Sequence, residues 1–262
     1  IPRMKKEIAA LQGIKHGNVT NILDANIDEH WFVTEFYPKG NLKQNKLNYV
    51  GKAVKSLRAF RGLVEGVAYL HSKGLVHRDI KPENIFILDP LGLILGDFGL
   101  VYFSDEQHTR LSETYENVGS RDWMPPWAMG IKQEDVRASF DVFGLGKILW
   151  YLIAKGEVLQ LWYFKDDKFN LEIMYPDDQA IKLINMILSR CLVEKEKDCL
   201  PNGESLLGII DEVLTKIDNN ADLLTKEDLR RPCRVCGVGI YQLVVNENIT
   251  DIRNFGLEPH GS

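Results

Sequence analysis

The chain has 262 residues, of which 45% are hydrophobic and 26% charged, an ordinary composition for a globular protein of about two domains. A net charge of -5 argues against broad nucleic-acid binding by the fold as a whole. No apolar stretch reaches membrane-spanning length, and four cysteines suggest no disulfide framework. We therefore expect a cytoplasmic protein without a membrane span.

Short elements are predicted at the start of the chain. Residues 3–12 form a short helix in this prediction, because Ile8 and Leu11 share one face and Gly13 follows as a terminator. Residues 22–27 and 31–36 are strand candidates joined by a polar turn. We expect these elements to form a small mixed unit.

Longer apolar patterns follow. Apolar residues recur at helical spacing over 52–73, which predicts a long amphipathic helix that ends near Gly74. The apolar runs 85–88 and 93–95, separated by a turn sequence, predict a hairpin. Residues 145–153 are apolar but short and include Lys147, which favours a buried helix over a membrane span.

Two polar segments flank the predicted hairpin, which would hold them side by side at its open end. The first is His77-Arg78-Asp79-Ile80-Lys81-Pro82-Glu83-Asn84, and the second is Asp97-Phe98-Gly99. Asn84 and Asp97 offer hard oxygen ligands for Mg2+, and Asp79 could accept a hydroxyl proton. Such groups suit phosphoryl transfer. From the residues alone, a polar turn before an ordinary hairpin is the alternative.

In this order, the two segments resemble the catalytic and metal-binding loops of eukaryotic-type serine/threonine protein kinases. The resemblance covers about residues 3–214. It implies an α+β fold, with a truncated small N-lobe, a mainly helical C-lobe and a short β-rich tail. It also implies ATP and Mg2+ as cofactors and a protein as the substrate.

The resemblance assigns catalytic roles to four residues. Asp79 would orient the substrate hydroxyl and accept its proton, and Lys81 would stabilise the transferred charge. Asn84 and Asp97 would bind the metal ions.

The resemblance also places the ATP-binding residues ahead of the long helix. Glu7 matches the C-helix glutamate, and Thr34 matches the gatekeeper. Residues Glu35 to Tyr37 match the hinge, whose backbone groups hydrogen-bond adenine.

Structural and regulatory roles are implied for further residues. His77 would support the catalytic loop, and Asp141 would anchor that loop from below, unless it is simply a carboxylate at a helix N-terminus. Arg78 would pair with a phosphorylated hydroxyl of the activation segment, residues 97–127. The other positions assigned in this way are Phe98 and Gly99 of the metal-binding motif, Thr114 as a phosphosite and Ser120 facing the substrate.

The chain departs from the kinase pattern in two places. It contains no Gly-rich loop and no Val-Ala-Ile-Lys strand, which would precede Glu7, so we expect a domain that lacks its first N-lobe strands. Pro125-Pro126-Trp127 replaces the usual Ala-Pro-Glu, and Cys199 falls near the expected partner arginine. We interpret this change as a structural swap in which Trp127 fills space.

Beyond the kinase-like region, residues 223–231 have the composition of a charged linker. Cys233-Arg-Val-Cys236-Gly then resembles one knuckle of a zinc ribbon, with a strand-like run after it. Only His260 is an obvious further ligand for Zn2+, so we favour a truncated ribbon, with a metal-free thiol pair as the alternative. The predicted units are therefore residues 1–37, 38–222 and 223–262.

Two other functions remain open at this point. A non-catalytic kinase-like scaffold or regulator would explain the departures from the pattern, although the intact metal-ligand set argues against it. A zinc-ribbon adaptor would place the function in the tail, which would bind a protein or nucleic-acid partner.

Overall fold

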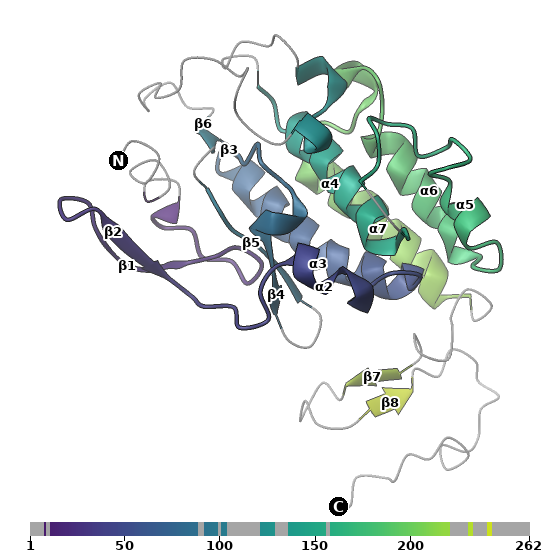
Figure 1. Cartoon of the computed structure of the whole chain (residues 1–262), viewed down its shortest axis with the longest axis horizontal. Coiled ribbons are helices and arrows are strands. Elements are labelled where there is room, and N and C mark those ends of the chain that lie inside the picture. The colour runs from purple at the N-terminus through teal and green to yellow at the C-terminus, as the bar shows by residue number, and fades with distance from the viewer. Residues whose placement is uncertain are drawn as a thin grey trace, which may run out of the picture.

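The computed structural model describes residues 8, 11–88, 92–98, 101–103, 121–128, 136–155, 158–220, 230–232 and 240–242. Its α-helices are α2 (Leu42–Asn45), α3 (Ala53–Ser72), α4 (Ser139–Ile153), α5 (Leu171–Met174), α6 (Ala180–Cys191) and α7 (Gly203–Asp218). Figure 1 shows these helices gathered on one side of the molecule, and the β1–β2 hairpin projecting from the other. This is the α+β architecture expected from the sequence.

Every strand in the described residues is one half of a two-stranded antiparallel sheet. The four pairs are β1 (Ile22–Asn26) with β2 (Trp31–Thr34), β3 (Leu75–Val76) with β6 (Tyr102–Phe103), β4 (Ile85–Leu88) with β5 (Gly92–Leu95), and β7 (Arg230–Pro232) with β8 (Ile240–Gln242). The hairpins expected near 22–36 and 85–95 are thus confirmed, and their strands differ from the predicted ranges by at most two residues.

Helix α3 is the amphipathic helix that the periodicity predicts, and its bounds agree to within one residue at each end. Gly74 follows the helix with a φ of 71°, a left-handed conformation that glycine adopts without a steric penalty. The buried face packs against α4, α7 and β5. Members of that face that are inaccessible to solvent include Leu57, Phe60, Leu63, Val64, Val67 and Leu70.

Helix α4 confirms the buried helix expected around 145–153 and begins earlier, at Ser139. All of its residues are buried, because it packs against both α3 and α6. A helix that is apolar on every side is typical of such a central position. Its charged residues, Asp141 and Lys147, are buried with the rest of the helix.

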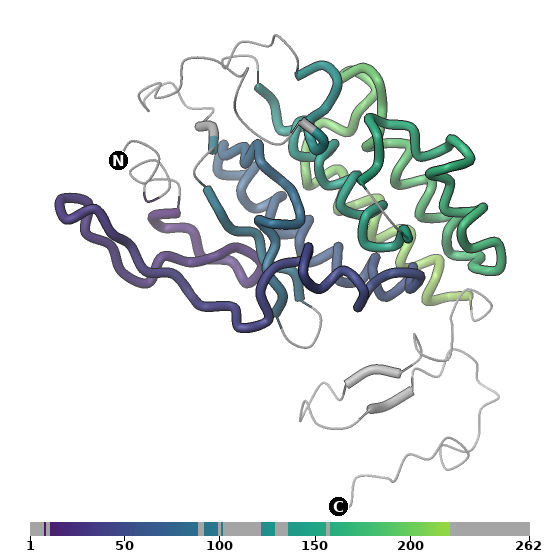
Figure 2. The backbone as a smooth tube through the Cα atoms, in the orientation of Figure 1, coloured from purple at the N-terminus to yellow at the C-terminus, as the bar shows by residue number. Residues whose placement is uncertain are grey.

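The chain before α3 is attached to the β4–β5 hairpin in two places. Leu95 N donates to Asn18 O at 2.9 Å, and Thr20 N donates to Leu95 O at 2.8 Å. On the other strand, Ile87 N donates to Gly40 O at 3.0 Å. Figure 2 shows this early part of the backbone running along the hairpin. The hairpin therefore links the two halves of the fold.

Of the helix expected at 3–12, Ile8 and Leu11 are described, and both are helical and buried. Gly13 follows with a φ of 86°, as a helix terminator would. No helix in the described ranges combines the length and apolar character needed to cross a bilayer.

The expected linker at 223–231 is wrong at its end, because β7 begins at Arg230 and pairs with β8. Proline is tolerated at the end of such an edge strand, because that position does not require the backbone N–H that proline lacks. The two cysteines of the tail lie in the stretch between these strands, outside the described residues.

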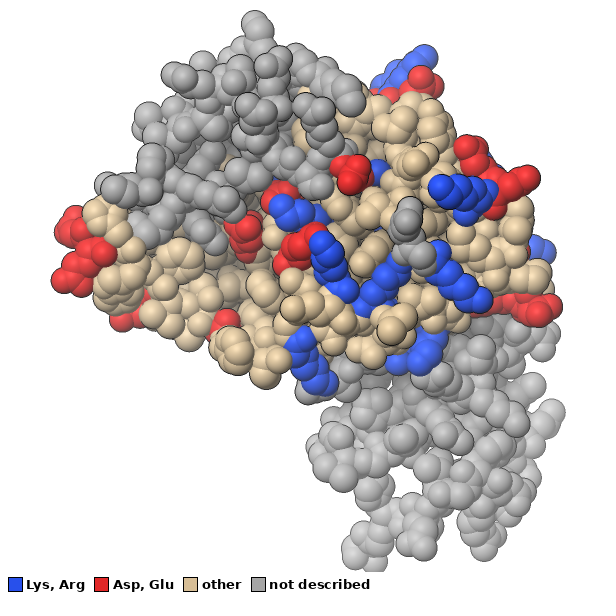
Figure 3. Space-filling model, in the orientation of Figure 1, with Lys and Arg blue, Asp and Glu red and all other residues tan. Residues whose placement is uncertain are grey.

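Charged side chains of both signs occur on the face of the molecule shown in Figure 3. Acidic side chains gather at the tip of the β1–β2 hairpin, where Asp28 and Glu29 form the turn. This distribution is consistent with the net charge of -5.

Candidate active site

The β4–β5 hairpin brings the two polar segments together. Its register pairs Ile85 with Leu95, and Gly96 N continues the ladder by donating to Asn84 O at 2.9 Å. Asp97 therefore follows directly on the residue that pairs with Asn84. A Cβ on Gly96 would lie 2.6 Å from the Phe86 ring, so this close approach of the backbone requires glycine.

Asp79 lies beside Asn84 in the loop before the hairpin, which we call the 77–84 loop. Its Oδ2 accepts hydrogen bonds from Lys81 Nζ at 2.6 Å and from Asn84 Nδ2 at 2.9 Å. Asn84 Nδ2 also donates to Asp79 O at 2.9 Å, which turns the amide oxygen of Asn84 away from Asp79. Within the described residues, these side-chain bonds use Oδ2 alone and leave Asp79 Oδ1 available for a ligand.

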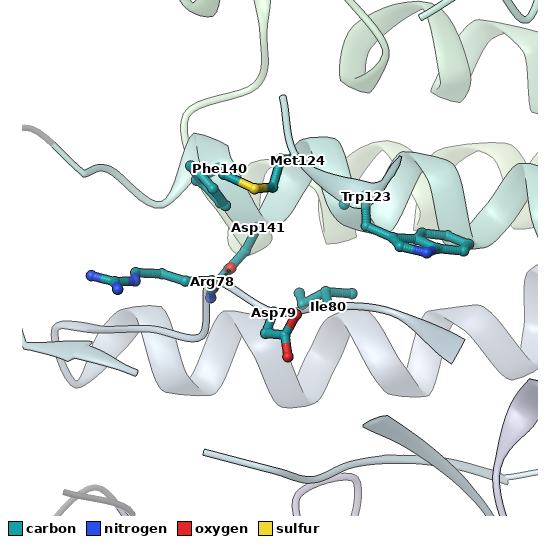
Figure 4. A pocket seen from close by; sticks show the side chains of 8 residues that line it. Arg78, Asp79, Ile80, Trp123, Met124, Phe140 and Asp141 are labelled. Atoms are coloured by element: carbon teal, nitrogen blue, oxygen red, sulfur yellow. Dashed lines mark hydrogen bonds between the residues drawn. The ribbon is translucent and has the colours of Figure 1, made fainter. Parts of the chain in front are cut away.

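Asp141 of α4 holds the start of this loop through its backbone. Its Oδ2 accepts from His77 N at 2.7 Å, and its Oδ1 accepts from Arg78 N at 2.8 Å. Figure 4 shows the Asp141 carboxylate reaching the backbone of residue 78. Burial would raise the pKa of Asp141, but the hydrogen bond from the His71 ring and the backbone donors outweigh it and lower the pKa. The side chain is therefore an ionised anchor for the loop.

His71 of α3 connects Asp141 of α4 to helix α7. Its Nε2 lies 3.0 Å from Asp141 Oδ2, and its Nδ1 accepts from Gly203 N, the first residue of α7, at 2.9 Å. A neutral ring with its proton on Nε2 satisfies both bonds. His71 thus joins α3, α4 and α7 at this point.

His77 is buried under the loop as a neutral ring. Burial lowers its pKa, although nearby carboxylates oppose that effect. Its Nε2 contacts Gly96 O at 3.0 Å, and its Nδ1 accepts from Asp79 N at 3.3 Å. The Phe98 ring packs edge-on against it at 4.8 Å. His77 thus ties the 77–84 loop to the segment that carries Asp97.

Two residues of the site have positive φ angles that side chains rarely adopt. The values are 71° for Arg78 and 57° for Asp97. Each such conformation costs about 1–3 kcal/mol, and surrounding contacts must hold it. The hydrogen bond that Arg78 N donates to Asp141 Oδ1 supplies such a contact at Arg78. Nothing in the local sequence indicates either angle.

The expected hinge residues form one continuous stretch after β2. Thr34 ends the strand, and the Tyr37 ring is buried in a stack on Phe86 with centroids 5.1 Å apart. Tyr37 Oη donates to Glu35 Oε2 at 3.1 Å, and burial raises the pKa of Tyr37. Because Phe86 belongs to β4, the stack fixes this stretch against the strand that follows Asn84. No local sequence pattern marked Phe86 as part of the site.

Trp127 fills space at the Pro-Pro-Trp departure, as expected. It lies in the short 3-10 helix Pro126–Ala128 and packs edge-on against Phe143 of α4 at 5.4 Å. Cys199 Sγ instead donates to Cys191 O at 3.5 Å, and burial raises its pKa to about 12. This thiol is therefore a packing group.

The remaining site predictions fall outside the described residues. They concern Glu7, Gly99, Thr114, Ser120, Cys233 and Cys236. Among the described residues, no group of three or more His, Cys, Asp or Glu side chains could hold a metal ion. A magnesium–nucleotide site needs fewer, because phosphates and water complete the coordination. Asn84 and Asp97 supply oxygen donors of the kind that Mg2+ prefers, at one end of one hairpin.

Comparison with known families gives a direct match. The family model described as "Protein kinase domain" matches residues 2–216. The chain belongs to the protein kinase family. The match has nearly the same extent as the resemblance noted in the sequence.

Several known kinases are similar to this one. The serine/threonine/tyrosine-protein kinase HT1 of Arabidopsis thaliana is 30% identical over 155 residues, which cover 57% of this chain and 38% of that protein. A probable serine/threonine-protein kinase of Clostridium acetobutylicum is 26% identical over 249 residues, or 86% of this chain and 35% of its own length. CBL-interacting serine/threonine-protein kinase 9 of A. thaliana is 33% identical over 183 residues, or 67% and 38%. This kinase chain therefore spans well under half of these relatives.

Proposed function

We propose that the chain is the domain of a serine/threonine protein kinase that transfers the γ-phosphate of ATP to a protein hydroxyl. The convergence of Asp79, Asn84 and Asp97 at one end of the β4–β5 hairpin carries this proposal. Lys81, two residues after Asp79, favours the serine/threonine branch, as do the names of the relatives. Thr34 and residues 35–37 are proposed to contact adenine.

The roles follow from the contacts of each side chain. Asp79, oriented by Lys81 and Asn84, would accept the proton of the substrate hydroxyl at Oδ1. Lys81, which donates to Asp79 Oδ2, would stabilise charge on the phosphate. Asn84 Oδ1 and the Asp97 carboxylate would hold Mg2+. The ion, when bound, offsets the charge of the triphosphate.

A metal-ligand variant tests this function in the protein expressed from its complete reading frame. We expect Asp97→Asn to lower Mg2+-dependent phosphate transfer to serine and threonine peptides by about 10²-fold or more, because one anionic ligand is lost. Transfer should be measured with labelled ATP against serine, threonine and tyrosine peptides.

Asp167→Asn, at an exposed position, is the matched control and should keep full activity. Equal activity in Asp97→Asn and the wild type would contradict the metal assignment. Transfer to none of the peptides, with ATP still bound, would favour the non-catalytic scaffold instead.

We further propose boundaries near residues 37 and 222, followed by a partial zinc ribbon. The pairing of β7 with β8 supports the tail assignment, because it brackets Cys233 and Cys236 as a knuckle requires. Such a tail would bind a protein or nucleic-acid partner. The cytoplasmic location stays a prediction.

Metal analysis tests the tail directly. We expect the purified protein to contain zinc in mass spectrometry and Cys233→Ser to lose most of it, because one thiolate ligand is removed. Cys199→Ser should retain the metal, since Cys199 packs against α6 in the kinase domain. A zinc-free wild-type protein would leave the cysteines as a reduced thiol pair.

A further inference from the structure

Lys147 is a buried cation in the middle of α4, with 1% of its surface exposed. Its Nζ donates to Leu159 O at 2.9 Å and to Asp122 O in the 3-10 helix Arg121–Trp123. A lysine ammonium group offers three donors, and two of them hold carbonyls of different segments. An apolar side chain would avoid the desolvation cost here but would lose both bonds.

The other contacts of α4 show which segments lie beside the hydrogen bonds of Lys147. At successive turns of the helix, Asp141 binds the backbone of the 77–84 loop, and a Cβ on Gly144 would lie 3.3 Å from Ile80 Cβ. Lys147 follows three residues later, and the Tyr151 ring then packs edge-on against Trp123 at 5.6 Å. Residues three and four apart share one helix face. One face of α4 therefore supports both the loop of Asp79 and residues 121–128.

Residues 121–128, here called the 121–128 segment, border the loop directly. Trp123 and Met124 line a pocket together with Asp79 and Ile80. Figure 4 shows Trp123 and Met124 on the α4 side of the 77–84 loop, which carries Asp79 and Ile80. The 121–128 segment therefore borders the residue that would receive the substrate hydroxyl.

We propose that Lys147 is a positioning residue that fixes the 121–128 segment against α4 and thereby shapes the surface on which the protein substrate lies. This inference rests on the proposed kinase function. Because the hydrogen bonds of Lys147 go to Asp122 and Leu159 and to none of the residues assigned to ATP or Mg2+, its effect should fall on the protein substrate and spare ATP.

Steady-state kinetics separate these effects. We expect Lys147→Met to raise KM for a phosphate-accepting peptide by about tenfold, with KM for ATP changed less than about twofold. Lys147→Arg keeps a cation with several donors and should recover part of the loss. Lys155→Met is the matched control, because Lys155 is exposed beside Tyr175 and should behave as wild type.

Hydrogen exchange provides a readout that needs no activity. We expect the amides of the 121–128 segment to exchange about tenfold faster in Lys147→Met, while those of α3 stay protected. If the wild-type protein transfers no phosphate, the kinase proposal fails. Hydrogen exchange still tests whether Lys147 fixes the 121–128 segment. Unchanged exchange in Lys147→Met, or equal increases in both KM values, would overturn the positioning role.

The pH dependence of wild-type exchange gives a second test without a substitution. Burial lowers the pKa of Lys147 to about 8, although the Asp122 carboxylate opposes that shift, and residues 158–160 bring no ionisable side chain. Once the segment opens, Lys147 regains its ordinary pKa of 10.5. Above pH 8 the open form binds a proton that the closed form lacks, so opening should become rarer by up to about tenfold per pH unit.

Below pH 8 both forms are protonated, and the opening constant should be flat. In Lys147→Met the pH dependence should disappear. The opening constant is obtained by correcting the exchange rate for intrinsic exchange. If it rises with pH or stays flat above pH 8 in the wild type, the proposed role of the buried Lys147 is contradicted.

Discussion

Replacing Asp79 by asparagine should lower kcat for phosphate transfer by about 10²–10⁴-fold, the usual contribution of a general base. The substitution keeps the size of the side chain and an oxygen that can accept from Lys81 and Asn84. It removes the basic oxygen that would take the hydroxyl proton. The protein should therefore stay folded and still bind ATP, and Asp79→Ala should likewise abolish transfer.

The measurement is single-turnover phosphate transfer by the wild type and by Asp79→Asn at matched thermal stability. Asp167→Asn again serves as the control, because its side chain is exposed. Full activity in Asp79→Asn would refute the assignment of Asp79 as the base. A parallel loss of ATP binding would point to a role in nucleotide affinity instead.

The second large effect concerns stability. Asp141→Ala should lower the free energy of unfolding by several kcal/mol, because each buried donor left without an acceptor costs about 1–3 kcal/mol. The backbone N–H groups of His77 and Arg78 and the ring of His71 would all lose their acceptor. Asp141→Asn should be milder, because its amide keeps one accepting oxygen.

Urea unfolding, followed by circular dichroism, measures this effect. Asp211→Ala is an informative control, since it removes a partly exposed ion pair with Arg61 and should cost about 1 kcal/mol or less. The folded-state pKa of Asp141 lies below its ordinary value of 3.8, so its stabilisation is complete above that value. It should be lost as pH falls through the folded-state pKa. A difference between wild type and Asp141→Ala that persists unchanged at low pH would argue against an ionised anchor.

Local sequence patterns predicted much of the fold correctly. The helical spacing of apolar residues gave the bounds of α3 to within one residue, and the turn residues between two apolar runs gave the β4–β5 hairpin. Both elements are stabilised by residues close together in the chain, so their signals are local. The candidate site was found for the same reason, because its polar residues lie in two short segments on either side of that hairpin.

Other features of the site depend on residues far apart in the chain. Asp141 contacts the backbone of His77 across 64 positions, and Lys147 contacts Asp122 across 25. The buried helix around Lys147 was predicted but the partners of its ammonium group were not, because a lysine in an apolar run gives no indication of the carbonyls that will surround it. The positive φ angles of Arg78 and Asp97 likewise depend on contacts made by the folded chain.

By itself, the sequence determined the secondary structure around the site and the order of its polar groups, since periodicity and turn chemistry act over a few residues. Only the tertiary structure decided which oxygen of Asp79 is available, what anchors the 77–84 loop, and how α4 supports the 121–128 segment. These arrangements depend on packing between distant segments, and the hydrogen-bond partners of a buried polar group are fixed only when those segments meet.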